Sequence, residues 1–367
     1  MTAAGKTFET TARVDGIGDI LLQVALPESA RYADGAPVVV TVPTCFTPDQ
    51  TGFHPFAEAQ KNGMISVTLM YSGRSNGTGA SSAGTDDYGG SGSLKALRDA
   101  VLFALGEKTN SEGYLLDQLS GIKPLYTDVG LYAFSHPGLA ATNVLATYTS
   151  ELKNVRFFVG YENPTQSLLS PLELGRYETE GKRKVTVNNA AYQYSDDYSL
   201  TDIQLDYSSV RYDAATSRPY FDLNGNGSAD ASGDYVFGDQ IPTFFGKRTY
   251  SAELLRALRH SGSLPSQSWP ADLSTPEEAE AIWPSRQSTT SYPKLAGHPN
   301  LHVILVFAVN GHVQSIPDNP NIHQSFDGLR AAGIWTRLNP DVSYVSSLSQ
   351  TVAAQFQEHD ANAEPSD

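Results

Sequence analysis

Ser135 has the sequence setting of a catalytic nucleophile. Residues 128–134 form an apolar run that ends abruptly at this serine, and residues 139–148 favour a helix. A strand, a serine and a helix in this order predict a nucleophile elbow, in which the hydroxyl stands at the apex of a sharp turn. The start of the helix offers N–H groups and a positive dipole end, which suit the oxyanion of acyl transfer. Gly138 comes one place later than the glycine of the usual G-x-S-x-G pattern, so a buried strand that ends in an ordinary serine turn is the alternative.

A second candidate site is a loop of alternating oxygen donors that starts at residue 222. Three such donors are followed at once by Gly227, as in the calcium loop D-x-[DN]-x-[DN]-G. Gly233 stands where an EF-hand has its bidentate Glu, and no helices are predicted on either side, so a β-hairpin with an Asx-rich turn is the alternative. The sequence predicts a structural Ca²⁺ ion here. The predicted ligands are oxygen atoms of Asp222, Asn224, Asn226, Ser228 (its backbone carbonyl), Asp230 and Asp234.

The composition limits the classes of partner. The chain has 367 residues, of which 40% are hydrophobic, and this is enough for one large core or two moderate ones. The formal net charge of -15 argues against nucleic acid and against an anionic membrane surface as partners. No apolar segment approaches the roughly 18–20 residues that a membrane span requires. The composition leaves the oligomeric state open.

The compartment is also left open by the sequence. The N-terminal residues contain no hydrophobic core of a signal peptide, so we expect a cytoplasmic protein, or an extracellular or periplasmic one whose leader has been removed. The one cysteine, Cys45, excludes an intrachain disulfide framework. A calcium loop would fit the extracellular or periplasmic case better.

Apolar runs predict an α/β core in the first part of the chain. The predicted strands are residues 20–27, 36–43, 64–71, 129–134 and 155–161, and the predicted helices are residues 56–62, 94–104 and 139–148. Strands that alternate with helices indicate parallel β-α-β units under one sheet.

A long polar segment then interrupts this alternation. It is rich in Tyr, Asp, Ser and Pro, and it contains few periodic runs. Two helices are predicted in it, at residues 252–259 and 276–283. After it, the predicted elements are a strand at residues 301–308, a helix at residues 322–332 and a strand at residues 333–338. We therefore expect a core of residues 1–162 and 299–350, an inserted segment of residues 163–298, and a C-terminal tail of residues 351–367.

The order of these elements resembles the α/β-hydrolase fold, with its esterases and prolyl-oligopeptidase-like serine hydrolases. The resemblance covers about residues 15–162 and 299–350, and this family commonly inserts a cap domain after the sixth core strand, as here. It implies that Ser135 is the nucleophile. It also implies that the backbone N–H of His136 is one oxyanion donor and an N–H close to Cys45 is the other. The His-Gly motif that often follows the third strand of the family is replaced here by Pro-Thr-Cys-Phe.

The resemblance also implies a base and an acid for the serine. In the family the acid normally follows the seventh strand, where the nearest carboxylate here is Asp318, and Glu162 after the sixth strand is the other candidate. The base normally follows the last strand, where this chain has no histidine. His323 and His312 are the remaining candidates, although a helix start and a turn would also explain them.

The resemblance thus implies a serine hydrolase that cleaves a carboxylic ester, or else a peptide bond, through an acyl-enzyme. Its partner would be a small-molecule ester or a peptide, and a cap stabilised by Ca²⁺ would restrict the pocket. The alternative is a catalytically degenerate hydrolase fold that binds calcium or another ligand without cleaving it. The missing histidine after the last strand favours this alternative.

Overall fold

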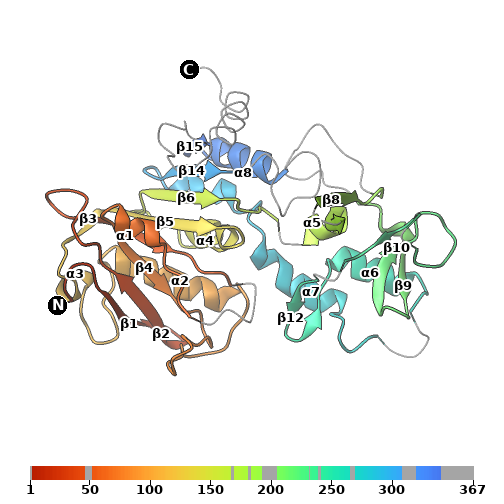
Figure 1. Ribbon diagram of the computed structural model, residues 1–367, viewed down its shortest axis with the longest axis horizontal. Helices are drawn as coiled ribbons and strands as arrows, with labels where there is room; N and C mark the ends of the chain where they lie inside the picture. Colours follow the sequence, from red (N-terminus) through yellow and green to blue (C-terminus); the bar gives the residue numbers. More distant parts are fainter. Residues whose placement is uncertain are drawn as a thin grey trace, which may run out of the picture. The chain divides into compact units, whose positions relative to one another are not determined.

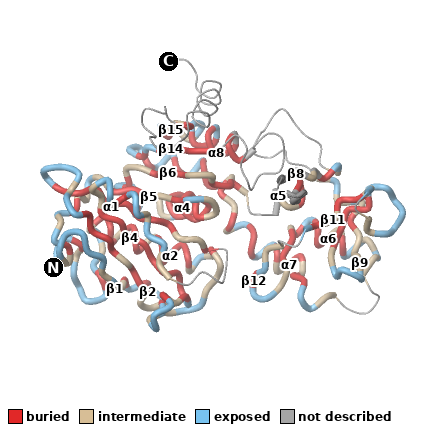
Figure 2. Tube along the Cα trace, viewed as in Figure 1, coloured by how far each residue is buried: buried red, intermediate tan, exposed pale blue. Residues whose placement is uncertain are grey.

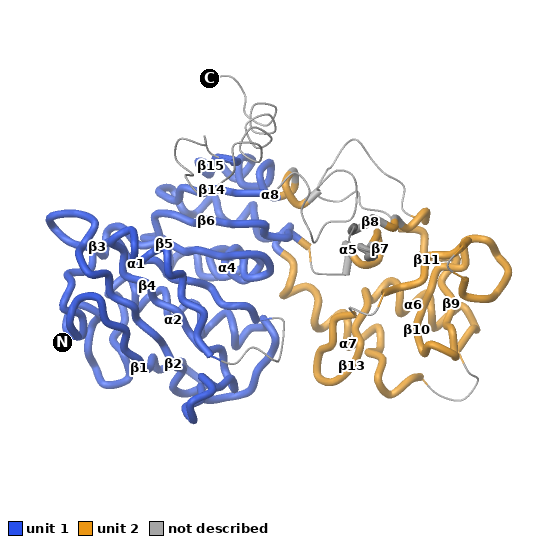
Figure 3. The backbone as a smooth tube through the Cα atoms, viewed as in Figure 1, with its two compact units in different colours: residues 1–165, 288–309, 325–367 blue, residues 166–287, 310–324 orange. Residues whose placement is uncertain are grey.

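The fold comprises two compact units, which are described separately (Figure 3). The first unit consists of residues 1–165, 288–309 and 325–367, and the second of residues 166–287 and 310–324. The computed structural model describes residues 2–45, 52–166, 169–180, 183–191, 205–230, 232–238, 241–264, 269–307 and 320–339. Among these residues no helix is both long and apolar enough to cross a membrane.

An eight-stranded sheet forms the core of the first unit (Figure 1). Its strands are β1 (Thr7–Val14), β2 (Gly18–Ala25), β3 (Ala36–Thr41), β4 (Ile65–Leu69), β5 (Pro124–Phe134), β6 (Phe157–Tyr161), β14 (His302–Val306) and β15 (Trp335–Leu338). They lie in the order β1-β2-β4-β3-β5-β6-β14-β15. Strand β2 is antiparallel to both of its neighbours, and every other neighbouring pair is parallel. The prediction of an α/β fold with a mostly parallel sheet is therefore confirmed.

Two neighbouring central strands, β3 and β4, are buried along their whole length (Figure 2). Every residue of β3 and of β4 is buried, so side chains on both faces of these strands are covered. This burial explains why they read as continuous apolar runs in the sequence. Strand β1 was not predicted, because it is a partly exposed edge strand of Thr, Glu and Arg with few apolar side chains.

Helices flank the sheet. They are α1 (Ala57–Lys61), α2 (Ser91–Ala104), α3 (Leu116–Leu119), α4 (Pro137–Thr147), the 3-10 helix η3 (Tyr292–Gly297) and α8 (Pro320–Ala331). Helix α2 packs against β1, β3 and β4, and α4 packs against β5, α2 and η3. Helix α2 begins three residues before the predicted start, because the Asp87 carboxylate accepts hydrogen bonds from the N–H groups of Gly90, Gly92 and Ser93.

The second unit is built from short strands and helices. Its elements are α5 (Leu169–Leu174), β7 (Gly175–Glu180), β8 (Arg183–Asn188), η1 (Tyr207–Ser209), β9 (Val210–Asp213), β10 (Arg218–Phe221), β11 (Tyr235–Val236), β12 (Thr243–Phe244), β13 (Lys247–Arg248), α6 (Ala252–His260), α7 (Pro276–Ile282) and η2 (Trp283–Arg286). Both predicted helices are present, and each has a side-chain N-cap. Ser251 accepts the Leu254 N–H, and Thr275 forms a capping box with Glu278.

The first segment of the second unit, residues 166–287, ends earlier than the predicted insertion of residues 163–298. Residues 288–298 belong to the first unit, where Ser291 donates a hydrogen bond to Asn143 of α4 at 2.7 Å. The buried His298 ring contacts the Leu145 carbonyl of the same helix at 2.9 Å. These contacts join residues about 150 positions apart, so the sequence pattern did not reveal them. The predicted tail, residues 351–367, lies outside the described residues.

Buried Glu173 in α5 should make the stability of the second unit depend on pH. Burial raises the pKa of Glu173 from 4.5 to about 7, against hydrogen bonds from Tyr207 and Ser251 that lower it. Between these two pH values the folded protein keeps a proton that the unfolded chain has lost. The free energy of unfolding should therefore fall by about 1.4 kcal/mol per pH unit as the pH rises through this window. Urea unfolding at pH 5 and at pH 7.5 measures the fall.

The matched variant is Glu173→Gln, which keeps the shape of the side chain but does not titrate. The difference between the two pH values should shrink in this variant. An equal pH dependence in Glu173→Gln and in the wild type would contradict the assignment to Glu173.

Candidate functional site

Ser135 lies in a strained turn between a strand and a helix. It follows the last residue of β5, and its φ of 63° is in the left-handed region, which costs a non-glycine residue about 1–3 kcal/mol. The Ser135 N–H donates a hydrogen bond to the Tyr161 carbonyl of β6 at 2.7 Å. Helix α4 then begins with Pro137, whose missing N–H is not needed at the first helical position. The turn has the backbone geometry of a nucleophile elbow.

Asn163 holds this elbow in place, and no local sequence pattern had indicated this role. Its Nδ2 donates to the carbonyls of Ala133, Ser135 and Tyr161 at 3.0, 2.8 and 3.2 Å. The side chain is buried against Gly138, where an added Cβ would come within 2.2 Å of Asn163 Cγ. Glycine at position 138 is therefore needed to make room for Asn163.

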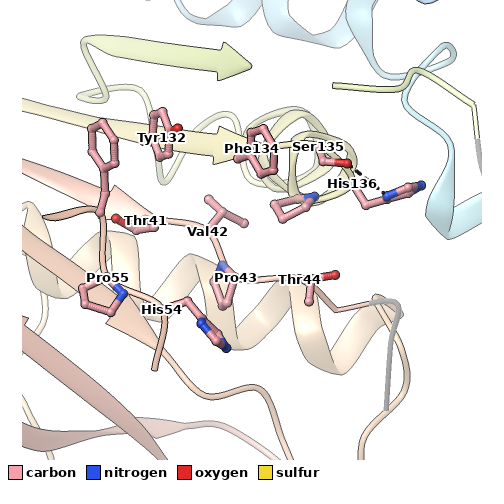
Figure 4. A pocket seen from close by; sticks show the side chains of 12 residues that line it. Thr41, Val42, Pro43, Thr44, His54, Pro55, Tyr132, Phe134, Ser135 and His136 are labelled. Carbon is pink, nitrogen blue, oxygen red and sulfur yellow. Dashed lines mark hydrogen bonds between the residues drawn. The ribbon is translucent and has the colours of Figure 1, made fainter. Parts of the chain in front are cut away.

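The imidazole of His136 contacts the serine hydroxyl. Its Nδ1 lies 3.3 Å from Ser135 Oγ, as the dashed line in Figure 4 shows. In the neutral tautomer with an unprotonated Nδ1, this nitrogen can accept the hydroxyl proton. The sequence had pointed to His136 for its backbone N–H, and the structure adds this contact of its side chain.

A cavity of about 530 Å³ opens beside Ser135. It is lined by residues 41–44, 54–56, 132 and 134–137, all from the first unit. Figure 4 shows Pro43, Thr44 and His54 on the side of the cavity that follows β3, and Phe134, Ser135 and His136 on the side formed by the end of β5. These lining residues include no Asp, Glu, Lys or Arg. The rings of Phe56 and Tyr132 stack with their centroids 3.8 Å apart. The volume suits a small molecule.

The loop after β3 is anchored by a buried cation. Arg74 is only 6% exposed, and it donates hydrogen bonds to the carbonyls of Thr44 and Cys45 at 2.7 and 3.0 Å. Its Nε forms an ion pair with Asp86 at 2.7 Å. Thr44 lines the cavity, whereas the Cys45 side chain is fully buried and is not part of the lining. The sequence showed Arg74 and Asp86 only as isolated charges in a Gly/Ser-rich segment.

The described part of the chain does not show a base and an acid of the predicted triad beside Ser135. His312 and Asp318 lie outside them, and of His323 only the backbone, in α8, is described. Glu162 directly follows β6, where its N–H donates to the Val306 carbonyl of β14 at 2.8 Å. Its φ of 53° marks a second sharp turn beside the elbow.

The predicted calcium loop lies between β10 and β11 in the second unit, where several of its side chains form hydrogen bonds within the loop. Asp234 accepts hydrogen bonds from the N–H groups of Leu223 and Asp230. Asp230 Oδ2 accepts from the amides of Asn224 and Asn226 at 3.0 and 2.9 Å. These bonds, together with those from Ser232, lower the pKa of Asp230 to about 2, so this carboxylate is charged at neutral pH.

One oxygen of Asp222 has no partner inside this loop. Asp222 Oδ2 accepts the N–H of Gly227 at 3.2 Å, but Oδ1 is buried without a hydrogen-bond partner. The residue as a whole is 7% exposed. Within the described part of the chain no three His, Cys, Asp or Glu side chains form a group that would hold a metal, so amide and carbonyl oxygens would have to supply part of any ligand set.

Comparisons with known proteins find similar solved structures, and these are hydrolases. No protein-family model and no curated protein match the sequence. An acylaminoacyl peptidase from Pyrococcus horikoshii matches with 10% identity over 90% of this chain and 36% of its own, at a TM-score of 0.42. Prolyl oligopeptidase B from Galerina marginata matches with 10% identity over 96% of this chain and 35% of its own, at a TM-score of 0.44. A thermostable esterase from Pseudomonas putida matches with 11% identity over 92% of this chain and 73% of its own, at a TM-score of 0.41.

This chain spans only about a third of the length of the two peptidases. The strand order with an antiparallel second strand, and the elbow that follows β5, are observed directly in this chain. Together they show that the first unit has an α/β-hydrolase-like fold.

Proposed function

We propose that the protein is a serine hydrolase that cleaves a small carboxylic ester through an acyl-enzyme. The observation that carries this proposal is the strained Ser135 turn, which stands at the wall of a cavity of about 530 Å³. A φ of 63° at a serine is unfavourable, and such strain persists where the surrounding structure enforces it, as the hydrogen bonds of Asn163 do here.

The proposed reaction uses a serine hydroxyl, a base and backbone N–H groups. Ser135 Oγ attacks the ester carbonyl carbon while its proton passes to a base, and N–H groups stabilise the resulting oxyanion. The carbon–oxygen bond to the leaving alcohol then breaks, and the alcohol takes the proton from the base. Water repeats these steps on the acyl-enzyme, releases the carboxylic acid and restores the serine.

A histidine is the proposed base. His136 is the candidate whose ring nitrogen contacts the serine hydroxyl, at 3.3 Å. His323 and His312, with Asp318 or Glu162 as the orienting acid, remain the candidates that the family resemblance implies. Measuring the rate of ester hydrolysis in single variants of these three histidines would assign the role.

The lining of the cavity supports an uncharged substrate. Among the described residues that line it are the stacked Phe56 and Tyr132, and none of these described residues carries a carboxylate, ammonium or guanidinium group. An ionic group would lose its hydration there without gaining a partner of opposite charge. A neutral ester with a small apolar acyl group therefore fits better than a charged peptide.

Short-chain p-nitrophenyl esters and a fluorophosphonate test this proposal. The wild-type protein should hydrolyse the esters, and the fluorophosphonate should form a covalent adduct that mass spectrometry locates at Ser135. A well-folded protein that shows neither hydrolysis nor the adduct would contradict the proposal. That result would favour a protein that binds its ligand on a hydrolase scaffold without cleaving it.

We also propose that the loop of residues 222–234 binds a structural Ca²⁺ ion. The supporting observation is the buried Oδ1 of Asp222, because a buried carboxylate oxygen without a partner is costly and a cation would satisfy it. The other Asp222 oxygen already holds the turn at Gly227. Oxygen donors from several loop positions are the ligands that calcium prefers. A hard cation of this kind would tie down the loop and supply no redox chemistry.

Calcium should raise the melting temperature of the protein. At a concentration of about 100 Kd, an ion that binds only the folded state adds about 2.7 kcal/mol, or about 5–10 °C. Calorimetry in CaCl2 and in EGTA measures the shift. Asp222→Asn should abolish it, whereas Asp213→Asn, in an exposed turn of the same unit, should retain it. Equal melting temperatures of the wild type in CaCl2 and EGTA would remove the calcium site.

A further inference from the structure

Two aromatic side chains line the cavity on the strand that leads to the serine. Tyr132 and Phe134 are two positions apart on β5, so they project from the same face of the sheet, and both belong to the cavity lining. Leu131 and Ala133, which alternate with them, are fully buried. The aromatic side of the cavity therefore ends directly before Ser135, and Figure 4 shows Phe134 between Tyr132 and Ser135.

Each of the two rings is held by a neighbouring ring. Tyr132 stacks on Phe56, with the ring centroids 3.8 Å apart and the ring planes within 10° of parallel. Phe134 packs against Tyr161, its partner on β6, with the centroids 5.4 Å apart. Burial raises the pKa of the Tyr132 hydroxyl, so this side chain stays neutral at the pH of an ester assay. Packing thus sets the orientation of two uncharged aromatic walls.

Phe134 keeps a large apolar surface open beside the nucleophile. It is 49% exposed, and among the exposed large hydrophobic residues in the described part of the chain it is the one that lines the cavity. Covering this surface with an apolar group of a ligand is favourable, because it removes apolar area from water. Since Phe134 directly precedes Ser135, such a group would belong to the molecule that the serine attacks.

The spacing of the two side chains suits one flat ring of a ligand. Residues two positions apart on a strand are about 7 Å apart. A flat ring that contacts both side chains needs about 3.5–4.0 Å on each of its faces, which this spacing matches. Figure 4 shows Val42 and Pro43, which follow β3, on the other side of the cavity. An aromatic ring also gains the stacked or edge-to-face contacts that a saturated ring cannot make.

We infer that the protein selects esters with an aromatic ring close to the scissile carbonyl, and that Phe134 and Tyr132 are the specificity-determining residues that contact this ring. This inference deepens the proposed serine hydrolase function and rests on it. The ring belongs either to the acyl group or to the alcohol, because both flank the carbonyl carbon that Ser135 attacks. The recognition is the same in both cases, and the experiment separates them.

Two pairs of neutral esters test the inference. Ethyl phenylacetate and ethyl cyclohexylacetate carry the ring in the acyl group, and benzyl acetate and cyclohexylmethyl acetate carry it in the alcohol. The saturated ring buries at least as much apolar surface, so burial alone does not favour the phenyl ester. We expect kcat/KM, measured by acid release, to favour the phenyl member of one pair by about tenfold or more. The pair that shows this preference identifies the side of the ester on which the ring binds.

Matched variants connect the preference to the two residues. Phe134→Leu and Tyr132→Leu keep an apolar side chain without the ring, so the preference should fall to about threefold or less. Phe134→Tyr keeps a ring and should retain the preference. Tyr114→Leu is the control and should retain it as well, because Tyr114 is an exposed aromatic residue of the same unit outside the cavity lining. A general loss of stability would lower both rates of a pair and leave their ratio unchanged.

Binding to Ser135→Ala separates ring recognition from catalysis. Phenylacetamide and cyclohexylacetamide imitate the first pair of esters, and N-benzylacetamide and N-(cyclohexylmethyl)acetamide imitate the second. In calorimetry the phenyl member of one pair should bind about tenfold more tightly than its saturated counterpart. Adding Phe134→Leu to Ser135→Ala should remove most of this difference.

The contrary outcomes can be told apart. If the wild type shows no Ser135-dependent turnover, the proposed function fails, and equal affinities within both amide pairs would then overturn the ring site as well. If the wild type is active but kcat/KM is equal within each ester pair, the function stands and the ring site is wrong. If the aromatic preference survives unchanged in Phe134→Leu and in Tyr132→Leu, the ring binds elsewhere and the role of these two residues is wrong.

Discussion

Ester hydrolysis should fall by about 10⁴-fold or more when Ser135 is replaced by alanine. The reason is that the alanine variant has no atom that can form the acyl-enzyme, so any remaining rate comes only from substrate binding beside the oxyanion donors. Fluorophosphonate labelling should disappear together with the activity. Initial rates with p-nitrophenyl acetate and intact-protein mass spectrometry measure the two effects.

The matched control for this variant is Ser111→Ala. Ser111 lies in the same unit, where its exposed hydroxyl donates to Asp19 at 2.9 Å, away from the cavity lining. The control should keep both hydrolysis and labelling. Ser135→Ala removes only the hydroxyl group and keeps the Cβ at this position of positive φ, so its melting temperature should stay close to that of the wild type. Full activity in Ser135→Ala would exclude the serine mechanism.

The second large effect is expected from Asn163, because one side chain satisfies three carbonyls of the elbow. Asn163→Ala removes hydrogen bonds to Ala133, Ser135 and Tyr161 and leaves a void against Gly138. We expect the free energy of unfolding to fall by about 2–4 kcal/mol. We also expect slower fluorophosphonate labelling, since the strained Ser135 turn can then relax. Urea unfolding and the rate of adduct formation measure these changes.

An isosteric variant makes this prediction sharper. Asn163→Asp keeps the size of the side chain but places a carboxylate oxygen against three carbonyl oxygens, so it should destabilise the fold at least as much as Asn163→Ala. Asn154→Ala is the control, because Asn154 makes one exposed hydrogen bond, to Glu107. A loss of less than about 0.5 kcal/mol in both Asn163 variants would show that the elbow does not depend on this residue.

The departures from the family pattern are resolved to different extents by the structure. Glycine at position 138 has a structural reason, since it makes room for Asn163. The Pro-Thr-Cys-Phe segment that replaces the usual His-Gly motif is held through two of its carbonyls by Arg74. The missing histidine after the last strand has no such explanation among the described residues, and His136 is the imidazole found at the serine hydroxyl.

The sequence by itself determined the elements of the core and the position of the elbow. Buried parallel strands such as β3 and β4 need apolar side chains on both faces, so their runs can be read directly from the chain. The same holds for α6 and α7, whose capping residues Ser251 and Thr275 are local signals. Strand β1 was missed because an edge strand buries only part of its side chains.

The tertiary structure alone decided which distant residues support the serine. Asn163 acts on residues about 30 positions away, and Arg74 reaches back about 30 positions to the loop after β3. Both segments meet the site because parallel strands end at the same edge of the sheet. A polar side chain in a loop has the same local sequence signal whether it faces water or a buried carbonyl, because its burial is set by packing between segments. Local pattern could therefore place Ser135, but only the fold shows what holds it there.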